Sequence, residues 1–256
     1  MLTALTHEVP PSLAKCELSY LERRSIDYDM ALVQHAAYRQ ALADCGAQVR
    51  QLDCNLDHPD GAFVEDTAIV LDQAALLTSM GVASRRAEVD QIASVLTDYR
   101  TVHRVAAPAT IEGGDVLLVG RTFLVGLTER TNREGVAALA TVSHPLGYEV
   151  VSVEVQGCLH FKSACTALDD ETLLVNREWF DPETLSGWRM VDVDAKESFG
   201  ANALPIGERV LLSASHPRTA DKVAGLGFNV QLLDISEFEK AEAALTCLSL
   251  LIEHEE

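Results

Sequence analysis

The amino-acid sequence predicts an α/β fold of mixed sheet character, built from a repeated unit of about 45 residues. Pairs of short apolar strands joined by tight turns alternate with helical segments, which is typical of α/β proteins. A polar residue also recurs at the entrance to each strand pair, since Asp66, Asp115, His160, Asn202 and Cys247 are separated by 49, 45, 42 and 45 residues. Such a period indicates five repeated units, although α/β units also recur at such intervals without symmetry. If the units surround an axis, these five side chains converge on one central site.

Three elements are predicted in the first part of the chain. Residues 28–44 are rich in helix-forming residues and predict a helix. Residues 63–79 contain two apolar runs and predict a strand pair that turns near Asp72. Residues 84–99 predict a second helix, with Ser84 as its N-cap and its apolar residues on one face.

The middle of the chain continues the alternation. Residues 115–126 read as two apolar runs around Gly120 and predict a hairpin. Residues 131–143 predict a helix, and residues 163–176 predict a strand pair that turns at Asp169.

Two further elements and an apolar run complete the pattern. Residues 204–213 predict a strand pair that turns near Gly207, and residues 218–226 predict a helix that stops near Gly225. The longest apolar-rich run, residues 243–252, has about ten residues, whereas a membrane span needs roughly twenty. We therefore expect no membrane partner.

Composition and charge exclude several classes of protein. The chain has 256 residues, of which 48% are hydrophobic, and this balance excludes a disordered tail and a disulfide-rich miniprotein. The 39 acidic and 20 basic residues give a net charge of −19. A protein this acidic is repelled by phosphate backbones, so we expect no nucleic-acid partner. A cationic small molecule is favoured instead.

The cysteines and the first residues predict a cytoplasmic protein. The six cysteines are scattered without CxxC pairs, which is typical of reduced thiols. The opening residues lack the basic and long apolar regions of a signal peptide.

Four acids stand next to apolar strands, where a carboxylate is costly unless a cation pairs with it. They are Asp60, Glu65, Asp66 and Glu112. Two interpretations remain open at this point: ion pairs with the protein's own arginines or lysines, or a cationic substrate. The two glycines that follow Glu112 allow close approach of the backbone to a ligand.

Cys247 and His160 are each weak evidence for a catalytic site when taken alone. A thiol in an apolar strand is more often inert core packing, and a histidine in a strand is more often hydrogen-bonded in the core. Cys158, His160 and Cys165 lack a second ligand pair with zinc-like spacing. The sequence therefore predicts no metal site and no cofactor.

Taken together, several strings resemble the dimethylarginine dimethylaminohydrolase family, within the guanidine-modifying superfamily that includes arginine deiminases and amidinotransferases. The resemblance runs along almost the whole chain. The strings are PDGAFVEDTAIV (59–70), SRRAEV (84–89), IEGGDVLLVG (111–120), FLVGLTERTNREG (123–135), LHFKSACT (159–166), GANAL (200–204) and LTCLSL (245–250).

The resemblance implies a fold and an activity. The fold is a five-bladed α/β propeller of ββαβ units with pseudo-fivefold symmetry, as one catalytic domain over residues 1–256. The activity is hydrolysis of Nω-methylated arginine to citrulline and dimethylamine or methylamine, through a covalent cysteine thiouronium intermediate. The substrate would be the cationic partner, and a homodimer is possible.

The resemblance also implies catalytic roles for three residues. Cys247 matches the nucleophile, His160 matches the general acid and base, and Glu112 matches the carboxylate that orients the guanidinium. The Cys247 thiol is expected to be protonated at rest and to ionise when the cation binds.

Six further residues match substrate-binding positions of the family. Acids match those that contact the guanidinium or line its pocket, arginines match the pair that grips the α-carboxylate, and one residue falls in a flexible lid. They are Leu18 in the lid, the acids Asp60, Glu65 and Asp66, and the arginines Arg85 and Arg130.

The chain departs from the family pattern at three places. Residues 78–81 read Thr-Ser-Met-Gly where the family often has Thr-Arg-Pro-Gly, Glu242 stands where Asp is common, and Ala203 stands where Cys is frequent. The first departure leaves alternatives open: an arginine deiminase, or a hydrolase of another substituted guanidine. A non-enzymatic guanidine-binding protein is the alternative from a different class.

Overall fold

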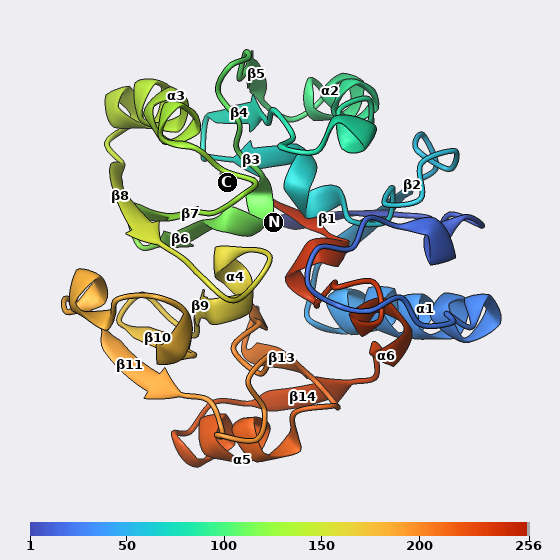
Figure 1. The fold of residues 1–256 in the computed structure, drawn as a ribbon, viewed down its shortest axis with the longest axis vertical. Helices are drawn as coiled ribbons and strands as arrows, with labels where there is room; N and C mark the ends of the chain where they lie inside the picture. The colour runs from blue at the N-terminus through green and yellow to red at the C-terminus, as the bar shows by residue number, and fades with distance from the viewer. Residues whose placement is uncertain (255–256) are drawn as a thin grey trace.

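The computed structural model describes residues 1–254 and contains five three-stranded sheets set around a common centre (Figure 1). In every sheet the middle strand pairs antiparallel with one neighbour and parallel with the other. The prediction of a five-bladed α/β propeller is confirmed. The strands, sheet by sheet, are β3 (Ala68–Val70), β4 (Ala74–Leu77) and β5 (Thr101–Arg104); β6 (Val116–Val119), β7 (Thr122–Leu127) and β8 (Glu149–Glu154); β9 (Cys165–Ala167), β10 (Thr172–Val175) and β11 (Arg189–Asp192); β12 (Ala203–Ile206), β13 (Arg209–Ser213) and β14 (Val230–Leu233); β15 (Leu250–Glu253), β1 (Leu2–His7) and β2 (Gln48–Leu52).

Helices lie at the periphery, because each parallel strand pair needs a crossover connection (Figure 1). Four sheets have an α-helix between the middle strand and its parallel partner, and in the sheet of β9, β10 and β11 two 3₁₀ helices take this place. The peripheral helices are α1 (Tyr28–Asp44), α2 (Glu88–Leu96), α3 (Arg133–Ser143) and α5 (Pro217–Gly225), and the 3₁₀ helices are η6 (Arg177–Trp179) and η7 (Pro182–Leu185).

The predicted helices match these elements, with differences of one to four residues at the ends of three of them. Helix α1 has the predicted bounds, and the Asp27 side chain caps it by accepting a hydrogen bond from Met30 N–H. Helix α2 begins at Glu88 instead of Ser84, because residues 83–85 form a separate 3₁₀ helix, η3 (Ala83–Arg85). Ser84 makes no cap hydrogen bond.

The last sheet joins the two ends of the described chain. Strand β15 pairs antiparallel with β1, with Leu2 opposite Glu253 and Leu5 opposite Leu250. This pairing completes the fifth sheet with strands from opposite ends of the sequence.

Short helical turns precede the first strand of four sheets, and this corrects one prediction. We expected Cys247, His160 and the acids at 65 and 66 to lie in strands. Glu65 and Asp66 lie instead in η2 (Val64–Thr67), and Cys247 lies in η8 (Thr246–Leu248). His160 is the residue before α4 (Phe161–Ala164), and η4 (Gly113–Asp115) precedes β6. A turn of three or four residues has no periodicity, so in sequence it reads as the start of the adjoining strand.

None of the helices within residues 1–254 combines the length and the apolar character that crossing a membrane requires.

Candidate active site

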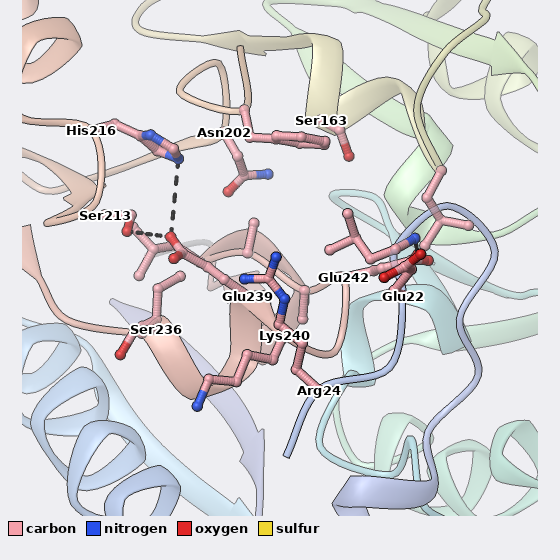
Figure 2. Close-up of a pocket in the computed structure, with 17 residues that line it drawn as sticks. Glu22, Arg24, Ser163, Asn202, Ser213, His216, Ser236, Glu239, Lys240 and Glu242 are labelled. Carbon is pink, nitrogen blue, oxygen red and sulfur yellow. Dashed lines mark hydrogen bonds and ion pairs between the residues drawn. The ribbon is translucent and has the colours of Figure 1, made fainter. Parts of the chain in front are cut away.

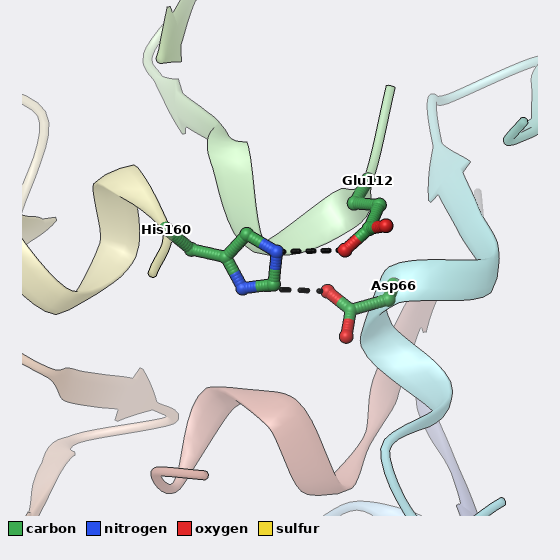
Figure 3. A group of neighbouring side chains, drawn as sticks. All are labelled: Asp66, Glu112 and His160. Atoms are coloured by element: carbon green, nitrogen blue, oxygen red, sulfur yellow. Dashed lines mark hydrogen bonds and ion pairs between the residues drawn. The ribbon is translucent and has the colours of Figure 1, made fainter. Parts of the chain in front are cut away.

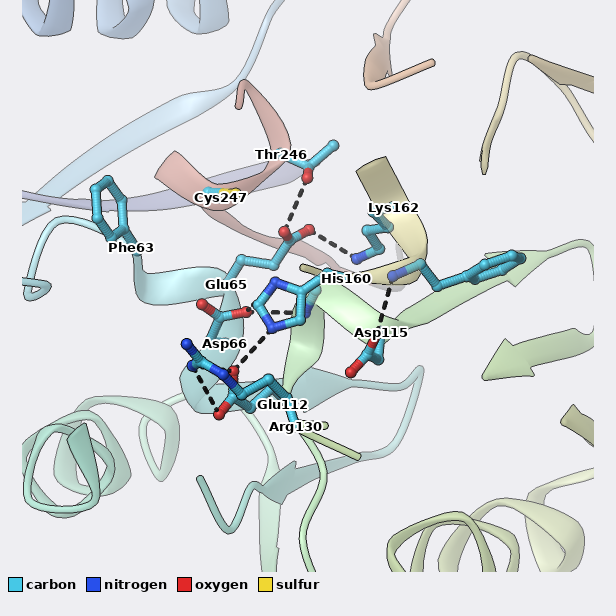
Figure 4. A network of polar contacts seen from close by, with 12 residues as sticks. Phe63, Glu65, Asp66, Glu112, Asp115, Arg130, His160, Lys162, Thr246 and Cys247 are labelled. Carbon is cyan, nitrogen blue, oxygen red and sulfur yellow. Dashed lines mark hydrogen bonds and ion pairs between the residues drawn. The ribbon is translucent and has the colours of Figure 1, made fainter. Parts of the chain in front are cut away.

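The short helical turns bring residues from four sheets to the centre of the ring. Turn η2 packs against η4 and η8, and α4 packs against η4. Their side chains form one network of polar contacts (Figure 4). Residues that are far apart in sequence therefore meet around one small cavity.

Cys247 lies on η8 and borders this cavity. Its sulfur accepts a hydrogen bond from the Ala244 N–H at 3.4 Å. Burial raises the pKa of the Cys247 thiol well above its usual value, and the carboxylates of Glu65 and Asp66 raise it further. These surroundings favour the protonated thiol at neutral pH.

His160 lies between two carboxylates (Figure 3). Its Nε2 is 2.8 Å from Glu112 Oε2, and its Nδ1 is 3.9 Å from Asp66 Oδ1. Burial lowers the pKa of a histidine, but the carboxylates of Asp66, Asp115 and Glu112 outweigh burial and raise the pKa of His160 to about 9. The imidazole is therefore a cation at neutral pH and can give up a proton.

Glu112 is fully buried behind the imidazole. It accepts a hydrogen bond from Gly81 N–H at 2.9 Å, and Arg130 Nη1 approaches Glu112 Oε2 at 3.2 Å. Burial alone would raise the pKa of Glu112, but the hydrogen bond and the charge of His160 hold it below its ordinary value. Glu112 is thus a carboxylate that fixes the imidazole ring.

Asp66 binds Arg85 Nη1 at 2.7 Å and accepts from Gly114 N–H at 2.9 Å. Burial opposes the charge of Asp66, but His160 and Arg85 outweigh it and lower its pKa to about 2. Arg85 also pairs with Glu88 at 2.9 Å and donates to Phe63 O at 3.2 Å. The protein's own arginine thus neutralises part of the acidic cluster.

Glu65 joins three turns through its two oxygens. Lys162 Nζ is 2.7 Å from Oε1, and the Thr246 hydroxyl donates to Oε2 at 2.8 Å. Burial raises the pKa of Glu65. Because Thr246 directly precedes Cys247, this network fixes the backbone beside the thiol.

Asp115 holds the backbone next to His160. One oxygen accepts from Phe161 N–H at 2.9 Å, and the other accepts from the Thr128 hydroxyl at 2.7 Å. Burial raises the pKa of Asp115 to about 6.

Six of the nine predicted residues border one cavity of about 20 Å³. They are Cys247, His160, Asp60, Asp66, Arg85 and Arg130. Of the other three, Glu112 stands behind His160, and Glu65 pairs with Lys162 instead of bordering this cavity. Leu18 packs on the apolar cluster beneath residues 17–24, next to Glu17, whose N–H donates to both Asp60 oxygens at 3.2 Å.

One trio has the spacing of a metal site, since ligand atoms of Asp66, Glu112 and His160 lie within 4.8 Å of one another (Figure 3). Both carboxylates are already bound by guanidinium groups, Asp66 by Arg85 and Glu112 by Arg130. The imidazole is protonated at neutral pH, whereas a metal needs its free lone pair. The trio therefore suits ion pairs with organic cations better than a metal ion.

Sequence reasoning assigned no role to three polar residues of this network. Lys162 follows His160 in the Leu-His-Phe-Lys string, and Thr246 precedes Cys247, so proximity in sequence was the available signal. Thr128 gives no such signal, because only the fold brings it to Asp115.

Known proteins resemble the chain in sequence. A family model described as N,N dimethylarginine dimethylhydrolase, eukaryotic, matches residues 18–177. A Streptomyces coelicolor protein named N(G),N(G)-dimethylarginine dimethylaminohydrolase is 40% identical over 249 residues, which cover 96% of this chain and 95% of that protein. The chain belongs to the dimethylarginine dimethylaminohydrolase family. A Pseudomonas aeruginosa protein of the same name is 33% identical over 226 residues, covering 88% of this chain and 89% of that protein.

Solved structures of this dimethylarginine dimethylaminohydrolase family match the whole arrangement. A cysteine-to-serine mutant of the Pseudomonas aeruginosa enzyme complexed with citrulline superposes with a TM-score of 0.92 at 31% identity, covering 98% of this chain and all of that one. The N-terminal domain of the arginine dihydrolase ArgZ has a TM-score of 0.88 at 20% identity over 99% of this chain and 98% of that one, a likeness of fold alone.

Proposed function

We propose that this chain hydrolyses Nω-methylated arginine to citrulline and dimethylamine or methylamine. As a member of the dimethylarginine dimethylaminohydrolase family, it is a hydrolase of C–N bonds in linear amidines. One observation carries the proposal for the reaction: the Cys247 thiol, the protonated His160 imidazole and the guanidinium-binding acids border or back a single cavity.

Substrate recognition follows from the charges around this cavity. We propose that Asp66, which now pairs with Arg85, and Asp60 beside it receive the substrate guanidinium, since acids on one side fix its plane and localise its charge. Arg85 and Arg130 border the same cavity, and their forked donors suit the substrate α-carboxylate. We propose that the substrate α-carboxylate accepts hydrogen bonds from the guanidinium groups of Arg85 and Arg130. In the structure these groups also pair with Asp66 and Glu112.

The first half of the reaction forms a covalent bond to sulfur. The bound guanidinium favours ionisation of the Cys247 thiol, whose pKa is otherwise raised, and the thiol proton passes to solvent water. The thiolate attacks the guanidinium carbon, and a new S–C bond forms. His160 gives its proton to the methylated nitrogen, the C–N bond breaks, and the amine leaves a thiouronium on Cys247.

The second half uses the same two side chains. His160, now neutral, takes a proton from water, which attacks the thiouronium carbon. The S–C bond breaks, the Cys247 thiolate leaves, and it takes the hydroxyl proton of the added oxygen as the ureido group of citrulline forms. Glu112 stabilises the imidazolium form, before the first proton transfer and after the second, through the 2.8 Å contact.

The first prediction is that purified protein forms citrulline from asymmetric dimethylarginine. Replacing Cys247→Ser is expected to lower this rate by at least about a thousandfold, because the attacking thiolate is lost. Colorimetric citrulline detection, with arginine offered in a separate reaction, makes the measurement. Cys54→Ser is the matched control, since Cys54 is a partly exposed thiol outside the cavity.

Each other outcome points to a specific alternative. Citrulline from arginine alone would mark an arginine deiminase with the same mechanism. Full activity of the Cys247→Ser variant would exclude the covalent route. Binding of methylated arginine without any citrulline would indicate a guanidine-binding protein.

A further inference from the structure

Residues 17–24, the covering segment, form no helix or strand, and Glu17 at their start borders the candidate active site. They connect the 3₁₀ helix η1 (Leu13–Lys15) to α1, and residues 19–24 are exposed. A segment without backbone ladders depends on side chains elsewhere in the protein for its hydrogen bonds. Its position is therefore set by whichever side chains supply them.

Glu242 supplies most of the hydrogen bonds to this backbone. Its carboxylate accepts from Ser19 N–H at 2.9 Å, from Tyr20 N–H at 2.6 Å and from Leu21 N–H. Hydrogen bonds to a charged acceptor are stronger than those between neutral groups. Three consecutive backbone N–H groups thus donate to one carboxylate, and Glu242 is more than 220 residues away from them in sequence.

The other contacts of the covering segment lead to the same cavity. Asp60 accepts from Glu17 N–H, and Arg130 Nη2 donates to the Ser19 hydroxyl at 3.0 Å. Both Asp60 and Arg130 border the cavity that contains Cys247. The covering segment is therefore attached to the cavity wall at one side by Asp60 and Arg130, and at the other side by Glu242.

The backbone at Glu242 does not favour a glutamate. Its φ is 58°, and among residues 1–254 it is the only residue other than glycine with positive φ. This left-handed conformation costs a residue with a Cβ about 1 kcal/mol more than glycine. A carboxylate occupies a position where the backbone alone would favour glycine.

Glu242 also stands between two cavities. With Leu159 and Ala243 it borders both the 20 Å³ cavity and a neighbouring one of about 470 Å³ (Figure 2). Leu21 and Glu22 of the covering segment border the larger one. Release of the covering segment from Glu242 would open the smaller cavity toward the larger.

We infer that Glu242 is a positioning residue, whose carboxylate holds residues 17–24 over the candidate active site. No hydrogen bond or ion pair within residues 1–254 joins Glu242 to Cys247 or His160, and the Glu242 carboxylate binds the covering segment instead. The inference rests on the proposed function only for the identity of the substrate that enters the cavity. Loss of the Glu242 carboxylate should raise KM for methylated arginine more than it lowers kcat, since a segment that opens more often retains the substrate less well.

Limited trypsin digestion tests this contact without any substrate. The covering segment ends in Arg23 and Arg24, which are exposed cleavage positions. In Glu242→Gln, cleavage there is expected to be roughly tenfold faster than in the wild type, because weaker hydrogen bonds let the segment open more often. Glu239→Gln is the matched control: this carboxylate binds Ser213 and Ser215 instead, and cleavage should keep the wild-type rate.

A second variant separates the effect of the Glu242 carboxylate from the effect of its backbone conformation. Glu242→Gly removes the carboxylate and relieves the positive φ, so it should unfold at or above the wild-type temperature and still be cleaved faster. Wild-type cleavage rates in both Glu242 variants would overturn the inference. An unchanged KM in an active Glu242→Gly enzyme would overturn it as well. Absence of turnover in the wild type would refute the proposed function and leave the digestion result valid.

Discussion

Four buried acids of the candidate site differ in what neutralises them. Asp66 faces Arg85, Glu112 faces His160 and Arg130, and Glu65 faces Lys162. Asp115 has only neutral hydrogen-bond donors, and burial accordingly raises its pKa to about 6. Each acid therefore has its own protonation behaviour although all lie within one network.

The acids were predictable from sequence, and their partners were not. A carboxylate beside an apolar run is unusual, so residues such as Asp66 and Glu112 stand out. Arg85 is 19 residues from Asp66, a separation that matches no periodicity. His160 is 48 residues from Glu112, close to the repeat of about 45, but a repeat does not report which side chains make contact. In the structure the acids pair with the protein's own cations, and the proposed substrate guanidinium would meet the same acids.

His160 leads to a prediction about stability and pH. Its pKa in the folded protein, about 9, exceeds the ordinary value of 6.5, so the folded state holds this proton more tightly than the unfolded state. The stabilisation is fully present below pH 6.5 and is lost as pH rises through about 9. The free energy of unfolding, measured by urea denaturation across this window, should therefore fall.

His160→Gln serves as the control for this stability prediction, because it removes the titrating group. The decline between pH 6.5 and 9 should be smaller in this variant than in the wild type. A wild-type stability that stays level across the window would contradict the raised pKa.

At the scale of single elements, the strand pairs were predictable and the turns before them were not. Runs such as 115–126 alternate around a glycine with positive φ, Gly120, and this signal is local. The turns η2, η4 and η8 span only three or four residues. Contacts between turns determine their helical geometry, and sequence patterns do not report such contacts.

Turn η4 gives a prediction at Gly114. A Cβ at this position would lie 2.5 Å from His160 Nδ1 and 2.9 Å from Asp66 Oδ1, so the imidazole must move. Gly114→Ala is expected to destabilise the fold by about 1–3 kcal/mol through overpacking. It should also lower kcat by roughly a hundredfold or more, because a displacement near 1 Å disturbs catalytic geometry.

Gly187→Ala is the matched control for this substitution, since nothing lies within 4 Å of a Cβ there. Its stability should stay within about 0.5 kcal/mol of the wild type. Citrulline assays and thermal unfolding of both variants make the comparison, and an active Gly114→Ala enzyme would show that the turn tolerates a methyl group.

For the molecule as a whole, the period of about 45 residues predicted the number of sheets. It could not predict how the fifth sheet is completed, because the partner of β15 is β1, about 250 residues earlier. Sequence periodicity describes neighbouring units, whereas this pairing joins strands at opposite ends of the described chain.

A substitution in β15 tests how much this sheet contributes to stability. Ile252 is fully buried and packs in one apolar cluster with Leu5 and with Ile92 of α2. Ile252→Ala is expected to lower the free energy of unfolding by about 2–5 kcal/mol, as for other large-to-small core changes.

Leu118→Ala is the control for Ile252→Ala, since Leu118 is 38% exposed and should cost much less. Urea denaturation of both variants gives the two values. Equal costs would mean that the junction between the two ends of the chain does not support the ring.

The pairing of β15 with β1 also determines when, during synthesis on the ribosome, Cys247 joins the candidate site. Strand β1 is translated before the other fourteen strands described and keeps an unpaired edge until β15 emerges. Cys247 lies three residues before β15, so it is translated after every other candidate site residue. The acids, the imidazole and both arginines are already translated by then. A nascent chain can therefore form the acidic pocket early, but Cys247 completes it only when the ring closes.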